Sequence, residues 1–482
     1  MLSSTILLLL PIVFALLCFV LPRRYSIWIS GAGAVIQFSY FMYLFLQFKI
    51  NHYQLYNFKF DWIPGLKDSF HIAVDTMSLL PLLLVSLITV IVVLAASLIY
   101  EKRDSAYFGL IFLTIAGLNG FFMAQNPITL YLFFELTLIP VYFLVLKWGG
   151  PKRKKAVFTF FIYTVFGSFL LLAAIFYIYS FVGINLMTSW SFLYNNHFPV
   201  QHQYWMAIVF FIAFGIKAPV FPFHTWQVNL YEQADKPSVI LIAALLSKMG
   251  VFGFLRFNFI TQDVIPKLSF YLIVICVMGV VYGALVAWRQ TNLSRLLAYA
   301  SMSHMSLLVA GTLTVYEEAY KGAIFQILAH GIAIAGLFFV ADVFQRKTGS
   351  DNLDANSGMA RVQPRFATYY FILVLAAIGL PLTSGFIGEF IMITNVTKFN
   401  KIAGAFAGLT IIYGAVYMLR CYQRSMFGKR HDERYQSFQL SLQEDYIFIV
   451  LTVLVIALGF FPSKWIDLTA YAIGQFGEYF KY

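Results

Sequence analysis

The chain has 482 residues, of which 61% are hydrophobic and 11% are charged, and its mean hydropathy is +0.78. A soluble domain carries about 25% charged residues, so this composition excludes an ordinary soluble fold and is typical of a chain in lipid. The formal net charge is +12. Because the basic residues stand in short loops between apolar runs, this charge reports membrane topology, and no nucleic-acid partner is expected.

Apolar runs follow one another along the whole chain. A bilayer core about 30 Å thick is crossed by about 20 helical residues, and the runs lack the alternation of a β-barrel. We therefore predict an all-α polytopic membrane protein of about fourteen transmembrane helices. The first run has no basic segment before it, so we expect a retained span rather than a cleaved signal peptide. The predicted spans are 2–21, 27–48, 75–99, 106–123, 126–146, 156–183, 204–230, 235–257, 267–288, 295–314, 321–343, 366–397, 402–424 and 444–465.

The loops that follow odd-numbered spans hold about twice as many Lys and Arg residues as the loops on the other face. The positive-inside rule places such loops in the cytoplasm or the mitochondrial matrix. We expect a bacterial inner membrane, with both termini on the periplasmic side.

Three cysteines lie far apart, each inside an apolar run: Cys18, Cys276 and Cys421. No pair has the spacing of metal ligands or of a redox motif. We expect them to be small buried hydrophobic side chains, and no metal site is predicted.

Four ionisable residues stand inside apolar spans, where each costs about 2.5–3.5 kcal/mol on insertion scales. Such residues indicate a path for protons or ions. The alternative is structural, since a buried pair can simply join two helices, and a lysine near a helix end can reach the interface with its ammonium group. The four residues are Glu135, Lys217, Lys248 and Glu389.

Two of the spans contain prolines that interrupt a helix by removing a backbone donor. Pro219 and Pro222 follow Lys217, and Pro381 precedes Glu389. Irregular backbone at membrane depth is tolerated beside water or inside protein, and broken helices at matching positions of two repeats indicate an ion site. We predict two inverted five-helix repeats with broken helices 7 and 12. The predicted segments are 1–105 (spans 1–3), 106–257 (first repeat), 267–424 (second repeat) and 444–482 (span 14 and tail).

Two histidines, His304 and His330, also lie within apolar helices. A buried histidine with a satisfied hydrogen bond is a common structural feature. Together with four ionisable groups at similar depth, however, both histidines are candidates for proton relays. His224 lies nearer a helix break and fits either interpretation.

Several segments together resemble a known family: FFELTLIPVYFLV, FGIKAPVFPFHTW, VILIAALLSKMGVFGFLRF, LSRLLAYASMSHMSLL and GLPLTSGFIGEF. In this order they are similar to the antiporter-like subunits of respiratory complex I, a family that includes subunits of Mrp-type sodium/proton antiporters. Glutamate at position 389 resembles the M-type subunit, and the chain is too short for the L-type subunit with its lateral helix.

The resemblance implies a proton-translocating subunit of NADH:quinone oxidoreductase with a hydrophilic axis along the membrane midplane. It implies no cofactor in this chain, since FMN, iron–sulfur clusters and quinone would bind partner subunits, and it implies L-type and N-type subunits as flanking partners. The alternatives are a subunit of an Mrp-type Na⁺/H⁺ antiporter and a structural spacer. The implied axis residues are the Glu135–Lys217 pair, the central Lys248, the relay residues His304 and His330, and the exit-side Glu389.

The sequence departs from the family pattern at two places. Tyr231 and Gln233 stand where the pattern has histidine and glutamate, and Asn292 and Ser294 stand where it has charged residues. The family's proton roles at these positions therefore do not carry over to this chain.

Overall fold

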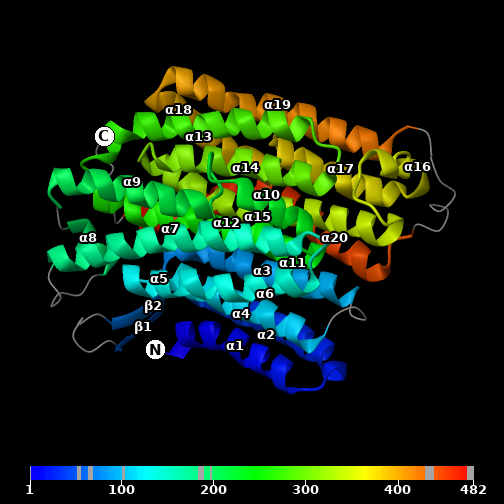
Figure 1. The fold of residues 1–482 in the computed structure, drawn as a ribbon, viewed down its shortest axis with the longest axis horizontal. Coiled ribbons are helices and arrows are strands. Elements are labelled where there is room, and N and C mark those ends of the chain that lie inside the picture. The colour runs from blue at the N-terminus through cyan, green and yellow to red at the C-terminus, as the bar shows by residue number, and fades with distance from the viewer. Residues whose placement is uncertain are drawn as a thin grey trace.

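The computed structural model describes residues 2–50, 56–62, 69–99, 104–182, 189–195, 198–428 and 439–474. In this part of the chain the fold is a bundle of helices that lie side by side along one common direction (Figure 1). Ten helices are long and apolar enough to cross a membrane, and two shorter apolar helices accompany them. The class of fold predicted from the sequence is confirmed, whereas the number of fourteen spans stays a prediction.

The first half of the chain folds into the following elements, in which η2 is a π-helical turn and η3 a 3₁₀ turn. They are α1 (Leu2–Val20), α2 (Arg23–Ile50), β1 (Tyr56–Asp61), β2 (Ser69–Val74), α3 (Thr76–Ser97), α4 (Ser105–Met123), α5 (Pro127–Leu136), α6 (Leu138–Trp148), α7 (Arg153–Val182), α8 (Trp190–Asn195), α9 (Val200–Lys217), α10 (Thr225–Gln233), α11 (Lys236–Leu241), η2 (Ile242–Leu246), α12 (Ser247–Phe257) and η3 (Asn258–Thr261).

The second half is helical throughout its described part. Its elements are α13 (Ile265–Trp288), α14 (Leu293–Thr312), α15 (Glu317–Thr348), η4 (Asp354–Asn356), α16 (Met359–Val362), α17 (Pro364–Ile378), α18 (Ser384–Phe399), α19 (Lys401–Met426), α20 (Leu442–Phe460) and α21 (Pro462–Gly474).

Both predicted helix breaks are present. Helix α9 ends at Lys217 and α10 begins at Thr225, because the prolines between them lack the N–H group that a continuous helix needs. Helix α17 ends at Ile378 and is capped by Gly379, whose φ of 75° suits glycine, and α18 begins at Ser384. In Figure 1 the α9–α10 pair runs from left to right and the α17–α18 pair from right to left. Opposite directions are what the predicted inverted repeats require, but the boundaries of these repeats stay a prediction.

A small β-sheet was not predicted. The segment between the second and third spans forms an antiparallel two-stranded sheet, in which Tyr56 pairs with Val74 and Asp61 with Ser69. Strand β2 also forms an isolated bridge between Ile72 and Ala124, which ties the sheet to the end of α4. The sheet lies at the left-hand end of the bundle in Figure 1, close to the start of α1.

The C-terminal span also differs in detail from its prediction. Helix α20 ends at Phe460, and a second helix, α21, begins at Pro462 because proline is well tolerated in the first turn of a helix. The predicted span 444–465 therefore runs across a break. Helix α21 packs against α3 and α15.

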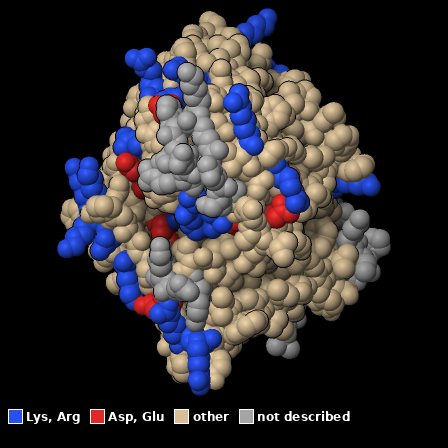
Figure 2. All heavy atoms as spheres, turned by 90° about the vertical axis from the view of Figure 1, so that its right-hand side faces the viewer, with Lys and Arg blue, Asp and Glu red and all other residues tan. Residues whose placement is uncertain are grey.

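Lys and Arg side chains gather at the right-hand end of the bundle (Figure 2). This basic end holds the starts of α7, α11 and α17 and the end of α15, which belong to loops that the sequence assigns to the cytoplasm. The basic residues predicted at 102–103 and 429–434 lie outside the described residues. The clustering agrees with the charge asymmetry of the sequence, and the sidedness itself stays a prediction.

Candidate functional site

Lys248 lies at the start of α12 and is fully buried. Its ammonium Nζ donates to the carbonyl oxygen of Ala243 at 2.8 Å and to Oγ of Ser247 at 3.2 Å, and it lies 2.9 Å from Nδ1 of His330. These contacts hold the amine in the interior of the bundle. They exclude the alternative in which Lys248 extends to the membrane interface.

A π-helical turn, η2, directly precedes Lys248. A π turn replaces the usual i→i+4 bonds with wider ones and is frequent at functional sites. Here the carbonyl of Ala243, which belongs to this turn, accepts from the side chain of the lysine five residues later. The wider turn thus exposes a backbone acceptor that fixes the lysine amine.

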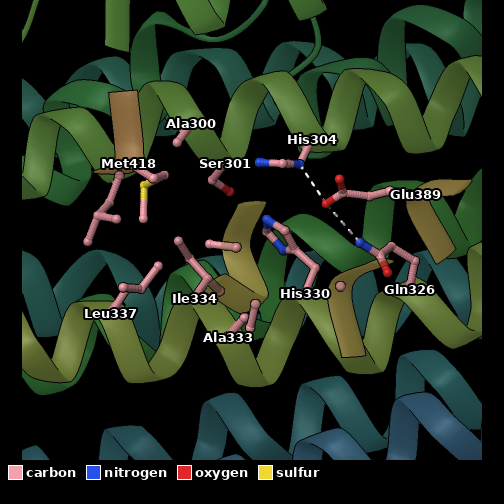
Figure 3. A pocket seen from close by; sticks show the side chains of 14 residues that line it. Ala300, Ser301, His304, Gln326, His330, Ala333, Ile334, Leu337, Glu389 and Met418 are labelled. Atoms are coloured by element: carbon pink, nitrogen blue, oxygen red, sulfur yellow. Dashed lines mark hydrogen bonds and ion pairs between the residues drawn. The ribbon is translucent and has the colours of Figure 1, made fainter. Parts of the chain in front are cut away.

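From Lys248 a chain of side chains continues through two histidines to Glu389. The rings of His330 and His304 have centroids 5.7 Å apart, and Nδ1 of His304 lies 2.9 Å from Oε1 of Glu389. Gln326 Nε2 also donates to this carboxylate at 3.4 Å. Figure 3 shows His304, His330, Gln326 and Glu389 converging from three different helices. We call Lys248, His330, His304 and Glu389 the buried relay chain.

His330, His304 and Glu389 of the relay chain line a small internal cavity. The volume open to the centre of a water molecule is about 20 Å³, which suffices for roughly one water. Ser301, Gln326 and Glu389 line it, together with apolar side chains such as Ile334 and Leu337. Oε2 of Glu389 and Oγ of Ser301 are buried without a hydrogen bond to the described part of the chain, so ordered water is expected beside them.

Two members of this site were missed by the sequence analysis. Gln326 lies one helical turn before His330 and therefore on the same face of α15, a spacing that could have revealed it. Tyr417 of α19 places its hydroxyl 3.3 Å from Nε2 of His304. A tyrosine among the many aromatic residues of this chain gives no such indication.

Lys217 lies at the break in the first broken helix. It is the last residue of α9, is 1% exposed, and donates from Nζ to Oγ1 of Thr137 at 3.3 Å. Its ammonium group also lies 4.5 Å from the centroid of the Phe134 ring, a cation–π contact. Glu135 is half-buried, and no hydrogen bond or ion pair joins it to Lys217 in the described structure; the two charges interact through space.

The backbone beside Glu135 is interrupted. Helix α5 ends at Leu136 and α6 begins at Leu138. Pro140 has no N–H to donate to the carbonyl of Leu136, four residues earlier, and its ring crowds that carbonyl. Glu135 therefore lies at a joint between two helices rather than in the middle of one regular helix.

The remaining candidates lie apart from these two groups. His224 is buried among the rings of Phe221, Tyr282 and Tyr299 and does not join the relay chain. The three cysteines are free and buried. Within the ranges that the structure describes, no group of three or more His, Cys, Asp or Glu side chains is placed to hold a metal ion.

Two departures from the family pattern form a polar clasp at the basic end. Asn292 Nδ2 donates to Oδ1 of Asp351 at 2.5 Å, and Ser294 Oγ donates to Oδ2 at 2.6 Å. Lys236 Nζ forms an ion pair with Oδ2 of Asp351 at 2.7 Å. The carboxylate beside the start of α14 thus belongs to Asp351, which lies in the loop after α15.

The chain shows clear similarity to proteins of known family. The family model described as NADH:quinone oxidoreductase/Mrp antiporter, TM, matches residues 124–413. NADH-quinone oxidoreductase subunit M of Rickettsia prowazekii is 33% identical over 446 residues, covering 92% of this chain and 90% of that protein. A cyanobacterial relative from Thermosynechococcus vestitus, NAD(P)H-quinone oxidoreductase chain 4 2, is 32% identical over 98% of this chain and 91% of its own length.

Two solved structures contain chains with the same fold as this protein. A chain of respiratory complex I from Thermus thermophilus superposes with a TM-score of 0.91 at 28% identity, covering 99% of this chain and 100% of that one. A chain of the Mrp complex from Dietzia sp. DQ12-45-1b shares the fold, with a TM-score of 0.85 at 20% identity and 98% coverage of both chains.

Broken helices in a polytopic bundle and a buried chain of ionisable side chains define a membrane subunit of the ion-translocating class. The chain belongs to the NADH:quinone oxidoreductase/Mrp antiporter membrane-subunit family, among relatives named as subunit M.

Proposed function

We propose that this chain is the M-type proton-translocating membrane subunit of an NADH:quinone oxidoreductase. The observation that supports this most strongly is the buried relay chain, in which four titratable side chains meet across α12, α14, α15 and α18. Titratable groups at this depth are rare and mark proton or ion paths. A merely structural ion pair would need two such groups, not a continuous row.

The geometry of the relay chain suits proton transfer. A neutral histidine presents one donor and one acceptor nitrogen, so it can take a proton on one side and release another on the opposite side. His330 faces Lys248 through Nδ1, and His304 faces Glu389 through Nδ1. A proton that leaves Lys248 can therefore pass through both rings, with one water between them, and reach the carboxylate.

The Glu135–Lys217 pair in the first half of the chain would control this proton transfer. Two unit charges 4 Å apart at an effective dielectric near 20 interact by about 4 kcal/mol, whereas moving one charge against 100 mV costs about 2.3 kcal/mol. Glu135 and Lys217 form no ion pair in the described structure, so their present interaction is weaker than this figure. A movement that brings the two charges to about 4 Å would supply enough energy to drive one transfer. Electron transfer in partner subunits would trigger that movement.

The same proposal covers the partners and the location. L-type and N-type subunits would flank this chain in the bacterial inner membrane, and FMN, iron–sulfur clusters and quinone would bind other subunits, leaving this chain without redox chemistry. The basic end would face the cytoplasm, and both termini the periplasm. The relative from Rickettsia and the chain from Thermus complex I support membership of such an assembly.

Co-purification tests this function. A tagged chain, extracted gently in detergent, should migrate with a large assembly that oxidises NADH and reduces quinone. A large assembly without NADH oxidation would contradict the proposal and would favour an Mrp-type antiporter. In that case an imposed sodium gradient should drive proton movement in vesicles without NADH.

A further inference from the structure

A polar cavity of about 920 Å³ opens at the basic end of the bundle. Its lining includes Glu232 at the end of α10, Lys236 at the start of α11 and Asp342 on α15. Figure 2 shows acidic side chains between Lys and Arg on this face. A cavity of this size and polarity holds many waters, so protons from the adjacent aqueous phase reach its floor.

The distance between this cavity and the relay chain can be estimated along helix α15. Asp342, which lines the cavity, and His330, which contacts Lys248, are twelve residues apart on the same helix, or about 18 Å. This distance is too great for a direct hydrogen bond. Any proton that enters from the cavity needs intermediate groups.

Tyr231 lies at an intermediate depth. Its ring packs edge-on against Phe338, with centroids 5.5 Å apart, and Phe338 lies one helical turn below Asp342 on α15. Tyr231 is fully buried, yet it directly precedes Glu232 of the cavity lining. Its backbone therefore adjoins the cavity lining, while its ring lies in the interior.

The hydroxyl of Tyr231 points into a polar cluster. It approaches Gln227 and Ser247 without closing a hydrogen bond of normal geometry, and the amide nitrogen and oxygen of Gln227 also lack a partner in the described structure. All three residues are fully buried. Buried polar atoms are normally satisfied by protein or by ordered water, so this cluster is expected to hold water.

The cluster reaches the relay chain through Ser247. Its Oγ accepts a hydrogen bond from Nζ of Lys248 at 3.2 Å. The polar groups thus follow one another from Tyr231 through Ser247 to Lys248, and the cavity lining begins at Glu232, the residue after Tyr231. Tyr231, which departs from the family pattern, therefore lies between the cavity lining and Ser247.

We propose that Tyr231 and Ser247 form a hydroxyl relay that carries protons from the cavity at the basic end to Lys248. This inference rests on the proposed function, because it requires Lys248 to accept a proton. The Tyr231 oxygen binds a proton from cavity water while its own O–H proton passes to Ser247, directly or through one water. Ser247 in turn releases its proton to the neutral amine of Lys248. Each hydroxyl gains one proton and loses one, so both end unchanged.

Tyr231→Phe tests the relay because it removes the hydroxyl and keeps the ring that packs on Phe338. In inverted membrane vesicles, NADH-driven acidification per assembled complex should fall at least about tenfold, since a positioned proton-transfer group contributes about 10²–10⁴-fold and water replaces part of it. Tyr231→His restores a proton-transfer group and should recover most of the rate. A role in packing alone predicts the reverse order, because Phe matches the tyrosine ring better than His does.

A control variant, Tyr370→Phe, and a second variant, Lys248→Met, distinguish failure of the hydroxyl relay from failure of the proposed function. Tyr370→Phe removes an equally buried hydroxyl, which contacts Cys421 and not the relay chain, and should pump normally. If Tyr231→Phe pumps at the wild-type rate while Lys248→Met does not, the hydroxyl relay is wrong and the proposed function stands. If both pump normally, the proposed function fails as well. Should Tyr231→Phe not assemble on a native gel, Ser247→Ala gives the same test.

Discussion

The two halves of this molecule hold their buried charges in different ways. In the second half, His330, His304 and Glu389 form a row that begins at Lys248 of the first half, and all four side chains are buried. In the first half, Lys217 is buried but bonds to Thr137, while the half-buried Glu135 acts on it through space. The contrast indicates a division of labour. The second half has the contacts to conduct protons, and the first half has a charge pair whose strength can be changed.

The largest effect is expected from Lys248→Met, which keeps the length of the side chain and removes the amine at the centre of the row. NADH-driven proton pumping should fall by at least about 100-fold in assembled complex, because no neighbouring group can replace the amine. Lys398→Met is a suitable control, since Lys398 is exposed in the last turn of α18. Equal pumping by the two variants would remove Lys248 from the path.

Glu389→Gln is expected to have the next largest effect. The amide retains a hydrogen-bonding shape beside Gln326 and His304 but cannot carry a proton, so pumping should fall by roughly 10–100-fold. Glu389→Asp keeps the carboxylate on a shorter arm and should recover part of the rate. Dye-quenching assays on vesicles measure both variants. If Gln supported pumping better than Asp, the carboxylate would have a structural role.

Glu135→Gln should cost less, and this prediction sharpens the comparison between the halves. Because Glu135 is half-buried and makes no direct bond to Lys217 in the described structure, its interaction with this lysine is weaker than a direct ion pair. We expect a three- to fivefold loss of pumping, which corresponds to about 0.7–1 kcal/mol. A loss as large as that of Lys248→Met would show that the division of labour is wrong, and so would wild-type pumping.

The smallest effect concerns the clasp at the basic end. Burial acts to raise the pKa of Asp351, but the charge of Lys236 and hydrogen bonds from Lys236, Ser294 and Asn292 hold that pKa below its usual value. A carboxylate with a lowered pKa stabilises the fold at neutral pH and loses this contribution as the pH falls through its folded pKa, which lies below about 4.

Asp351→Asn should therefore lower the free energy of unfolding of this subunit at pH 7 by about 1–3 kcal/mol, and the complex should aggregate at a lower temperature. The difference from wild type should persist at pH 5 and shrink only in stronger acid. Asp354→Asn is the matched control, because Asp354 is 62% exposed in its pair with Arg424, and exposed pairs contribute about 0–1 kcal/mol. Light scattering during heating measures both. Equal losses of thermal stability in the two variants would mean that the clasp on Asp351 contributes no more than an exposed ion pair.

Much of this fold follows from the sequence for simple physical reasons. About 20 apolar residues are needed to cross a bilayer, so each predicted span coincides with a helix or with two helices in succession. The breaks after Lys217 and before Ser384 follow from proline and glycine, whose effects on the backbone are local. The buried charges were found because lipid makes them costly wherever they stand.

Other features could not be predicted, because they depend on packing between distant segments. Lys248 and His330 are 82 residues apart, and only the folded bundle shows that they touch. The π turn before Lys248 has no proline or glycine to mark it. The strands β1 and β2 lie in a short stretch of mixed polar and apolar residues between two spans, where hydropathy carries little information. The clasp on Asp351 likewise depends on a loop that folds back over Asn292.

The central claim is that one continuous path runs through both histidines, and a double-mutant cycle tests it most directly. His304→Gln and His330→Gln each keep a polar side chain but cannot carry a proton at neutral pH. NADH-driven proton pumping should be measured for both single variants and for the double variant, at equal amounts of assembled complex. Two links of one path are not independent, so the double variant should pump about as well as the weaker single variant. Losses that multiply in the double variant would contradict a single path.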